Sequence, residues 1–202
     1  MKILGLTGSV GMGKSTAASM LRRMGVTVYD ADAAVHRMMS KGGIAVAAIA
    51  AAFPGVERGG AIDRAALGKL VFGNDPAMKR LEAIVHPLVR QDENRFLNRM
   101  RRRREKLVVM DVPLLFESGR HRRYDATMVV TAPEFLQRAR VLARRGMTPE
   151  RLASIRARQM PDAEKRRRAD FIIPSGLGRA PTWRKLSAVL RALGMPRRSG
   201  LD

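Results

Sequence analysis

The stretch that decides the fold is residues 2–16, which read KILGLTGSVGMGKST. Its first six residues are largely apolar, which is typical of a strand buried on both faces of a parallel sheet. The next residues match G-x-x-x-x-G-K-S, in which glycines let the backbone turn so that its N–H groups face the oxygens of a phosphate. Apolar residues then recur with helical spacing, from Ala17 to Met24. The order of strand, glycine-rich loop and helix predicts a nucleotide phosphate-binding loop.

Two positions of this loop have specific chemical roles. Lys14 is expected to bridge the β- and γ-phosphates of a nucleoside triphosphate, and the Ser15 hydroxyl to ligate Mg²⁺. The predicted nucleotide-binding residues of the loop are Gly8, Gly11, Met12, Gly13, Lys14, Ser15 and Thr16. A glycine-rich turn matched by chance is the alternative, and the strand before the loop and the helix after it argue against that alternative.

Four further apolar runs predict more strands of the same sheet. They cover residues 26–30, 107–112, 126–131 and 171–173. Helical patterns lie between them, so the crossovers give a parallel sheet with helices on both faces. The sequence therefore predicts an α/β fold with a five-stranded parallel sheet flanked by helices.

Helix starts are marked by capping residues. The pairs Thr148-Pro149 and Asp75-Pro76 each combine a capping side chain with a proline in the first turn. Thr131 and Glu134 have the spacing of a capping box, which predicts a helix that begins directly after the fourth strand.

Two segments are longer than a minimal sheet and its crossover helices require. Residues 33–106 predict an inserted helical subdomain. Residues 138–168 carry 11 basic and 3 acidic residues, which predicts a separate basic helical hairpin. The core is then expected at 1–32, 107–137 and 169–195, with a loose tail at 196–202.

Composition restricts the class of protein. The 202 residues are 46% hydrophobic and 28% charged, which fits one globular unit. No apolar run approaches the roughly 20 residues of a membrane span, and no secretory signal is evident, so we expect a cytoplasmic protein without a membrane partner. The absence of cysteine excludes disulfides, thiolate catalysis and cysteine-ligated zinc. The net charge of +21 suits either nucleic acid or a small polyanionic substrate.

Acidic residues at two strand ends are candidates for catalysis. The second predicted strand ends in YDAD, and the carboxyl ends of parallel strands line the ligand crevice. Asp30 or Asp32 could accept a proton from an attacking hydroxyl, and either could instead cap the next helix. Asp111 closes the third strand, where it could organise Mg²⁺ through water or be an ordinary strand-end aspartate.

Basic residues supply further candidates. Arg140 and Arg144 project from one helix face, so two guanidinium groups could meet a phosphate cluster when the hairpin closes. Solvent-exposed arginine is the alternative. His86, before Pro87, could contact substrate or be a packed histidine at a helix end. Arg103, in the run MRRRR, is interpreted as part of a solvated helix end.

In this order, several stretches resemble the dephospho-CoA kinase family. They are LTGSVGMGKST at 6–16, YDAD at 29–32 with His36 after it, IVHPLV at 84–89, VPLLFE at 112–117, Arg140 with Arg144, RQM at 158–160, and AD at 169–170. The likeness runs from Lys2 to about Leu193. The sequence departs from the family pattern at Ser175, where an asparagine is expected, and Asp111 is not a fixed part of that pattern.

The resemblance implies a P-loop kinase that transfers the γ-phosphoryl of ATP to the ribose 3′-hydroxyl of dephospho-CoA. The products are CoA and ADP, in the last step of coenzyme A biosynthesis. It implies that residues 33–106 hold the acceptor and that residues 138–168 are the lid. The implied catalytic residues are Asp32 as the base, Lys14 and Arg140. The other implied roles are nucleotide binding for Arg144, acceptor binding for Thr7, Asp32, His86, Leu115 and Arg140, and Mg²⁺ binding for Ser15. Mg²⁺ binding by Asp111 is expected only from its place at the strand end.

Two other functions fit part of the sequence. A different P-loop nucleoside or nucleotide kinase is the nearer one, and the long insert at 33–106 favours a larger acceptor. The other is a basic nucleic-acid-binding P-loop protein, which the 4% aromatic content and the absence of a recognition motif disfavour. We expect no specific nucleic-acid partner, and a monomer or weak homo-oligomer.

Overall fold

The computed structural model describes residues 1–195, and the tail expected at 196–202 lies outside these described residues. The chain divides into two compact units. The strand unit comprises Met1–Tyr29 and Arg104–Asp202, and the helical unit comprises Asp30–Arg103.

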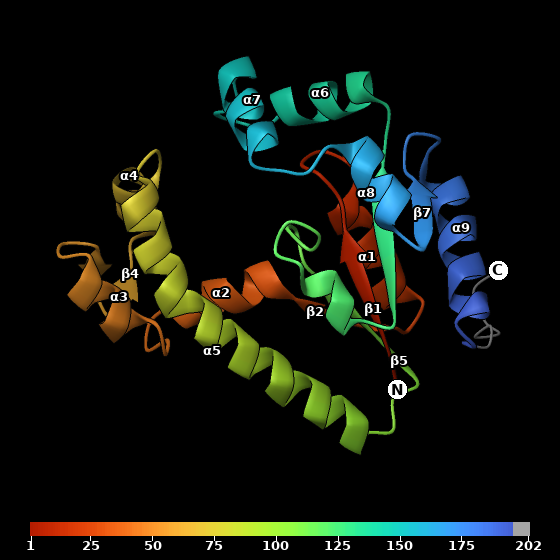
Figure 1. Ribbon diagram of the computed structural model, residues 1–202, viewed down its shortest axis with the longest axis horizontal. Helices are drawn as coiled ribbons and strands as arrows, with labels where there is room; N and C mark the ends of the chain where they lie inside the picture. Colours follow the sequence, from red (N-terminus) through yellow and green to blue (C-terminus); the bar gives the residue numbers. More distant parts are fainter. Residues whose placement is uncertain (196–202) are drawn as a thin grey trace. The chain divides into compact units, whose positions relative to one another are not determined.

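A five-stranded parallel sheet, in the order β2-β5-β1-β6-β7, forms the centre of the strand unit (Figure 1). The strands are β1 (Lys2–Thr7), β2 (Thr27–Asp30), β5 (Leu107–Asp111), β6 (Ala126–Thr131) and β7 (Phe171–Pro174). β1 pairs with β5 on one side and β6 on the other, so Leu4 lies opposite both Val109 and Ala126. The predicted α/β fold is confirmed. Because β1 is the middle strand, the loop that follows it emerges at the centre of the sheet edge.

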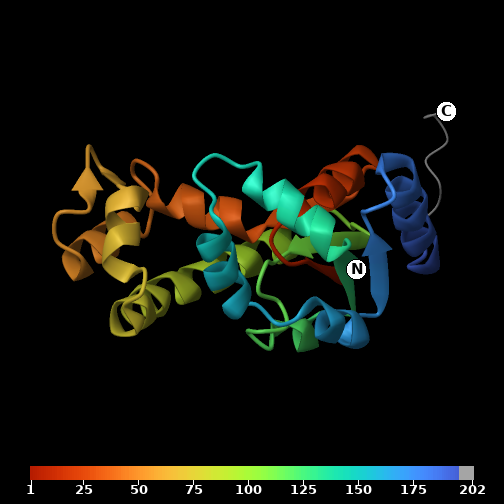
Figure 2. The ribbon, with the colours of Figure 1, turned by 90° about the horizontal axis from the view of Figure 1, so that it is seen from above.

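Helices cover both faces of this sheet. The helices of the strand unit are α1 (Lys14–Arg23), the 3-10 helix η1 (Arg120–Arg123), α6 (Glu134–Leu142), α7 (Pro149–Ala157), α8 (Asp162–Arg168) and α9 (Arg179–Ala192). α1 and α9 pack side by side on one face, and α8 lies on the other (Figure 2). Leu4, Leu21 and Leu186 are fully buried in the core between sheet and helices. The apolar runs of β1, β5 and β6 are thus accounted for by burial on both faces.

The helical unit is built around one long helix, α5 (Asp75–Arg102). Its other elements are α2 (Ala31–Met39), α3 (Val46–Ala52), β3 (Glu57–Arg58), β4 (Ala61–Ile62) and α4 (Arg64–Val71). α2, α3 and α4 each pack against α5, whose buried residues include Val85, Val89 and Phe96. β3 and β4 form a hairpin that the sequence pattern did not predict. Gly59 and Gly60 turn it with φ values of 58° and 79°, in the left-handed region that glycine adopts at least cost.

The helix starts differ from the sequence predictions at two places. Thr148 caps α7 as predicted, since its side chain accepts the N–H of Arg151. The cap of α5 is Asn74 rather than Asp75. The capping box at Thr131 is wrong: β6 continues through Thr131, and its hydroxyl donates to Asp162 Oδ2 at 2.7 Å. Because that backbone belongs to the sheet, α6 begins only at Glu134.

Within the described residues, none of the helices combines the length and the apolar character needed to cross a membrane.

Candidate functional site

The phosphate-binding loop runs from the end of β1 to the start of α1, as the sequence predicted. Gly11 and Gly13 have φ values of 77° and 88°, which L side chains rarely adopt. Both also lack room for a side chain. A Cβ on Gly11 would lie 2.5 Å from Val141 Cγ2, and one on Gly13 would lie 2.9 Å from Ser175 Oγ. Gly8 is equally confined, since a Cβ there would lie 2.8 Å from the Val130 carbonyl oxygen.

Lys14 and Asp111 form an ion pair at the start of α1. Lys14 Nζ donates to Asp111 Oδ1 at 2.6 Å, and Asp111 is only 3% exposed. β5 and β1 are neighbours with Leu6 opposite Asp111, so the end of β5 lies directly beside the loop. Asp111, which was expected to bind Mg²⁺, is therefore the ion-pair partner of Lys14, which was expected to bind the phosphates. This arrangement fixes the ammonium group in place before any nucleotide binds.

The remaining loop residues divide into buried and exposed groups. Met12 is buried, and its carbonyl oxygen accepts the Ser175 hydroxyl at 2.7 Å. Ser15 and Thr16 are exposed at the first turn of α1. Within residues 1–195, the Ser15 hydroxyl makes no bond to another residue, so it is free to meet a ligand. Exposed hydroxyls at a helix N-terminus, beside backbone N–H groups, are suited to a polyphosphate.

Oxygen ligands suited to Mg²⁺ are present in the strand unit. The Ser15 hydroxyl and the Asp111 carboxylate are of the hard oxygen type that this cation prefers. Residues 1–195 contain no group of three or more His, Cys, Asp or Glu side chains that could hold a metal by themselves. Mg²⁺ keeps several waters and takes further oxygens from substrate phosphates, so a hydroxyl and a carboxylate suffice as its protein ligands.

Arg140 lies beside the phosphate loop. Its Nη1 and Nη2 donate to the hydroxyl and carbonyl oxygens of Ser175, at 3.1 and 3.0 Å. Nη1 is also 3.7 Å from the position that a Cβ on Gly13 would occupy. Arg144 is exposed and lies beyond the end of α6 at Leu142, so the prediction that it shares a helix face with Arg140 is wrong. Ser175, where the family resemblance led us to expect asparagine, thus joins Arg140 to the loop through its own bond to Met12.

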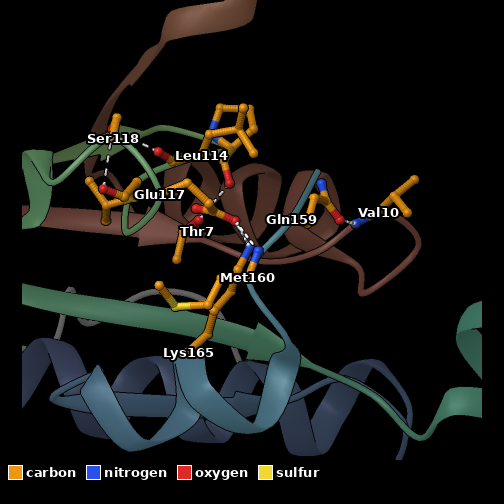
Figure 3. A network of polar contacts seen from close by, with 10 residues as sticks. Thr7, Val10, Leu114, Glu117, Ser118, Gln159, Met160 and Lys165 are labelled. Atoms are coloured by element: carbon orange, nitrogen blue, oxygen red, sulfur yellow. Dashed lines mark hydrogen bonds and ion pairs between the residues drawn. The ribbon is translucent and has the colours of Figure 1, made fainter. Parts of the chain in front are cut away.

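Two predicted acceptor contacts of the strand unit have buried side chains. Thr7 is fully buried, and its hydroxyl donates to the Pro113 carbonyl oxygen at 2.9 Å (Figure 3). Leu115 is also fully buried and lies under β1, where a Cβ on Gly5 would come within 2.8 Å of Leu115 Cδ2. These contacts hold the turn after β5 against the end of β1.

The predicted acidic pair of the helical unit separates into two roles. Asp30 is the N-cap of α2, and its Oδ1 accepts the Ala33 N–H at 2.8 Å. Asp32 lies in the first turn of α2 and is exposed, with no bond or ion pair to another residue of the described chain. Of the two alternatives that the sequence left open, capping therefore falls to Asp30.

The histidines of the helical unit lie on two helices. His86 is exposed in the middle of α5, which continues through Pro87, so the interpretation of a packed histidine at a helix end is wrong. His36, on α2, accepts a hydrogen bond at Nδ1 from Arg64 Nη1 at 2.8 Å. Since arginine only donates, this bond fixes Nδ1 as the unprotonated nitrogen.

Sequence reasoning missed the side chains that surround the loop from outside. Gln137 Nε2 donates to the Val10 carbonyl oxygen at 2.8 Å, and the Val10 N–H donates to Gln159 Oε1 at 3.1 Å. Lys165 is fully buried and pairs with Glu117 at 2.8 Å. Part of a signal was available, because Gln159 and Glu117 lie in two of the stretches that carry the family resemblance.

A family model and curated relatives identify the family of the chain. Residues 2–177 match the family model described as dephospho-CoA kinase. A dephospho-CoA kinase of Paramagnetospirillum magneticum is 66% identical over 82% of this chain and 78% of its own length. One of Rhodospirillum rubrum is 57% identical over 93% and 90%. A crystal structure from Thermus thermophilus superposes with a TM-score of 0.84 at 38% identity, over 95% of this chain and 97% of that one.

Proposed function

The chain belongs to the dephospho-CoA kinase family, and we propose that its phosphate loop, Asp32 and Arg140 carry the phosphoryl transfer of that family. The enzyme is an ATP-dependent kinase that phosphorylates dephospho-CoA at the ribose 3′-hydroxyl, giving CoA and ADP in the last step of coenzyme A biosynthesis. The observation that supports the assignment of residues is the loop itself, with its left-handed glycines and the lysine held at its end.

The strand unit would bind and activate ATP. Backbone N–H groups of residues 8–16 would surround the phosphates, and Lys14 would bridge the β- and γ-phosphates from its place beside Asp111. Ser15, and Asp111 through water, would hold Mg²⁺, which would neutralise charge on the β- and γ-phosphates. Arg140, beside Gly13, and Arg144 would stabilise the negative charge of the transferring group.

Asp32 would act as the base in the helical unit. Its carboxylate accepts the proton of the acceptor hydroxyl while that oxygen forms a bond to the γ-phosphorus, and the bond from the γ-phosphorus to the bridging oxygen of ADP breaks. Asp32 is exposed and has no bond or ion pair to another residue of the described chain, so its carboxylate is accessible to the acceptor hydroxyl, which supports this role. Asp30 is less suited, since its carboxylate caps α2.

The remaining assignments follow the same division. Residues 33–106 would hold dephospho-CoA, with His86 among the contacts, and residues 138–168 would act as the lid. Thr7 and Leu115 would contribute by fixing the turn after β5, because their side chains are buried. We propose a cytoplasmic enzyme, monomeric or weakly self-associating, without a specific nucleic-acid partner.

A coupled ADP-release assay tests the function directly. ATP is supplied with dephospho-CoA, adenosine, AMP or other nucleosides as the hydroxyl acceptor, with and without a chelator of divalent cations. Turnover with dephospho-CoA should exceed turnover with each other acceptor by at least 100-fold, and the chelator should abolish it. A nucleoside preferred over dephospho-CoA would contradict the proposed acceptor, and full activity with chelator would contradict the proposed metal.

A further inference from the structure

The outer side of the phosphate loop is held at a single residue, Val10, by two glutamine side chains. The Val10 carbonyl oxygen accepts from Gln137 Nε2 at 2.8 Å. The Val10 N–H donates to Gln159 Oε1 at 3.1 Å, as Figure 3 shows. Both main-chain groups of one loop residue are therefore satisfied by side chains more than 100 positions away in the sequence.

Neither glutamine amide can be flipped so that its oxygen and nitrogen change places. A backbone N–H only donates, so Gln159 must present its oxygen, and a backbone carbonyl only accepts, so Gln137 must present its nitrogen. The chemical partners thus fix the orientation of each amide group. A side chain of the same size without these atoms would leave one main-chain group of Val10 unpaired.

Each glutamine is itself fixed in position. Gln137 is 3% exposed on α6. A Cβ on Gly11 would lie 3.0 Å from the Gln137 carbonyl oxygen and 2.5 Å from Val141, so α6 packs directly on the loop. This contact leaves little room for the loop to move towards α6, and the bond from Gln137 to Val10 restrains it from moving away.

Gln159 is fixed through its neighbour in the sequence. The Met160 N–H donates to Glu117 Oε1 at 2.8 Å, and the same oxygen pairs with the fully buried Lys165 of α8 at 2.8 Å (Figure 3). A lysine with no exposed surface is costly unless it is paired, so this ion pair is a strong restraint on the segment that carries Gln159. The connection between α7 and α8 is therefore attached to the turn that follows β5.

We propose that Gln137 and Gln159 are positioning residues for phosphoryl transfer, which clamp the phosphate loop at Val10 in its phosphate-binding shape. The inference rests on the proposed function of the loop. The two bonds come from residues on either side of α7 along the chain. The clamp acts on the geometry of the loop N–H groups, which stabilise charge in the transition state, rather than on the acceptor.

The test compares Gln159→Met with Gln159→Glu and uses Lys185→Met, on the exposed face of α9, as the matched control. Methionine keeps the length and removes the acceptor atom, so kcat should fall about tenfold while the KM for dephospho-CoA changes less than twofold. Glutamate keeps an oxygen for the Val10 N–H, so its kcat should stay within threefold of wild type, with a higher KM for ATP from its charge. Lys185→Met should match wild type.

Gln137→Met should show the same loss of kcat, and the double variant should lose no more than the worse single variant, because both bonds restrain one residue. The Gln159 variants decide the proposal whatever Gln137→Met does to folding. Wild-type kcat in Gln159→Met, or equal losses in Gln159→Met and Gln159→Glu, would overturn the clamp. A wild-type chain that does not phosphorylate dephospho-CoA in the same assay would instead contradict the proposed function.

Discussion

The strand unit and the helical unit hold their candidate catalytic side chains in different ways. In the strand unit, Lys14 is paired with Asp111 and Arg140 is bonded to Ser175. In the helical unit, Asp32 is exposed and makes no bond to the residues that the structure describes. A paired side chain is positioned by the fold, whereas an unpaired one must be positioned by substrate. Substitutions in the strand unit should therefore affect stability as well as activity, and those at Asp32 activity alone.

The largest effect is expected from Asp32→Asn. Asparagine keeps the size of the side chain but cannot take up the proton, so kcat should fall about 10³-fold, within the usual range of a lost general base. The dissociation constant for ATP should stay within twofold of wild type. The midpoint of thermal unfolding should be unchanged, because the exposed carboxylate has no partner in the described chain to lose. Steady-state kinetics, nucleotide titration and calorimetry measure the three quantities.

Asp30→Asn is the control for that experiment. Asparagine caps a helix about as well as aspartate, so the bond to the Ala33 N–H is retained and both stability and kcat should change little. If Asp30→Asn proved the more damaging of the two, the base would be Asp30, and the separation of capping from catalysis along α2 would be wrong.

Lys14→Ala should lower kcat by at least about 100-fold, since the lysine contacts the phosphates most strongly in the transition state. It should also lower the midpoint of thermal unfolding, because Asp111 is left as a buried carboxylate without its cation. A loop lysine facing only ligand would not affect stability. Lys14→Ala should thus lower both activity and stability, whereas Asp32→Asn should lower activity alone.

The double variant Lys14→Ala/Asp111→Asn separates the two losses. The neutral amide removes the buried charge that has lost its lysine, so the unfolding midpoint should rise again towards that of wild type while kcat stays low. A midpoint that stays as low as in Lys14→Ala would mean that the ion pair contributes nothing to the stability of the strand unit.

Much of the strand unit could be predicted because buried parallel strands have a continuous apolar pattern. The bounds of β1 and β6 agree with the predicted runs at both ends. The hairpin of β3 and β4 could not be found in this way, since strands of two residues are too short for any periodicity. The loop residues were recognisable because glycine, lysine and serine at fixed spacing have a single chemical explanation.

The partners of the loop could not be predicted, because they depend on contacts between distant parts of the chain. The sequence indicates that Asp111 ends a strand, but only the order of strands brings it beside Lys14. Gln137 shows the same limit: a polar residue on an amphipathic helix is normally solvated, and here it is buried because its partner is a main-chain carbonyl.

Arg140→Ala should give the smallest of these losses, about tenfold in kcat, with less than twofold change in the KM for either substrate. Its guanidinium already lies beside Gly13, bonded to Ser175, so its contribution is made at transfer rather than at binding. Arg103→Ala removes the same charge from the exposed C-terminal end of α5 and should leave kcat unchanged.

The salt dependence of this pair of variants distinguishes a specific contact from general electrostatic attraction. A chain with a net charge of +21 attracts polyanionic substrates over long distances, and that attraction weakens as ionic strength rises. If long-range attraction were the main contribution of the arginines, both variants would raise the KM for ATP similarly, and the difference from wild type would vanish in high salt.

A direct contact between Arg140 and the phosphates predicts a different salt dependence, because salt screens weakly at the distance of a hydrogen bond. The kcat of Arg140→Ala should therefore remain about tenfold below that of wild type from low to high salt, while Arg103→Ala follows wild type throughout. Equal, salt-sensitive losses of activity in the two variants would mean that Arg140 acts only through its charge, as any surface arginine would, despite its bonds to Ser175.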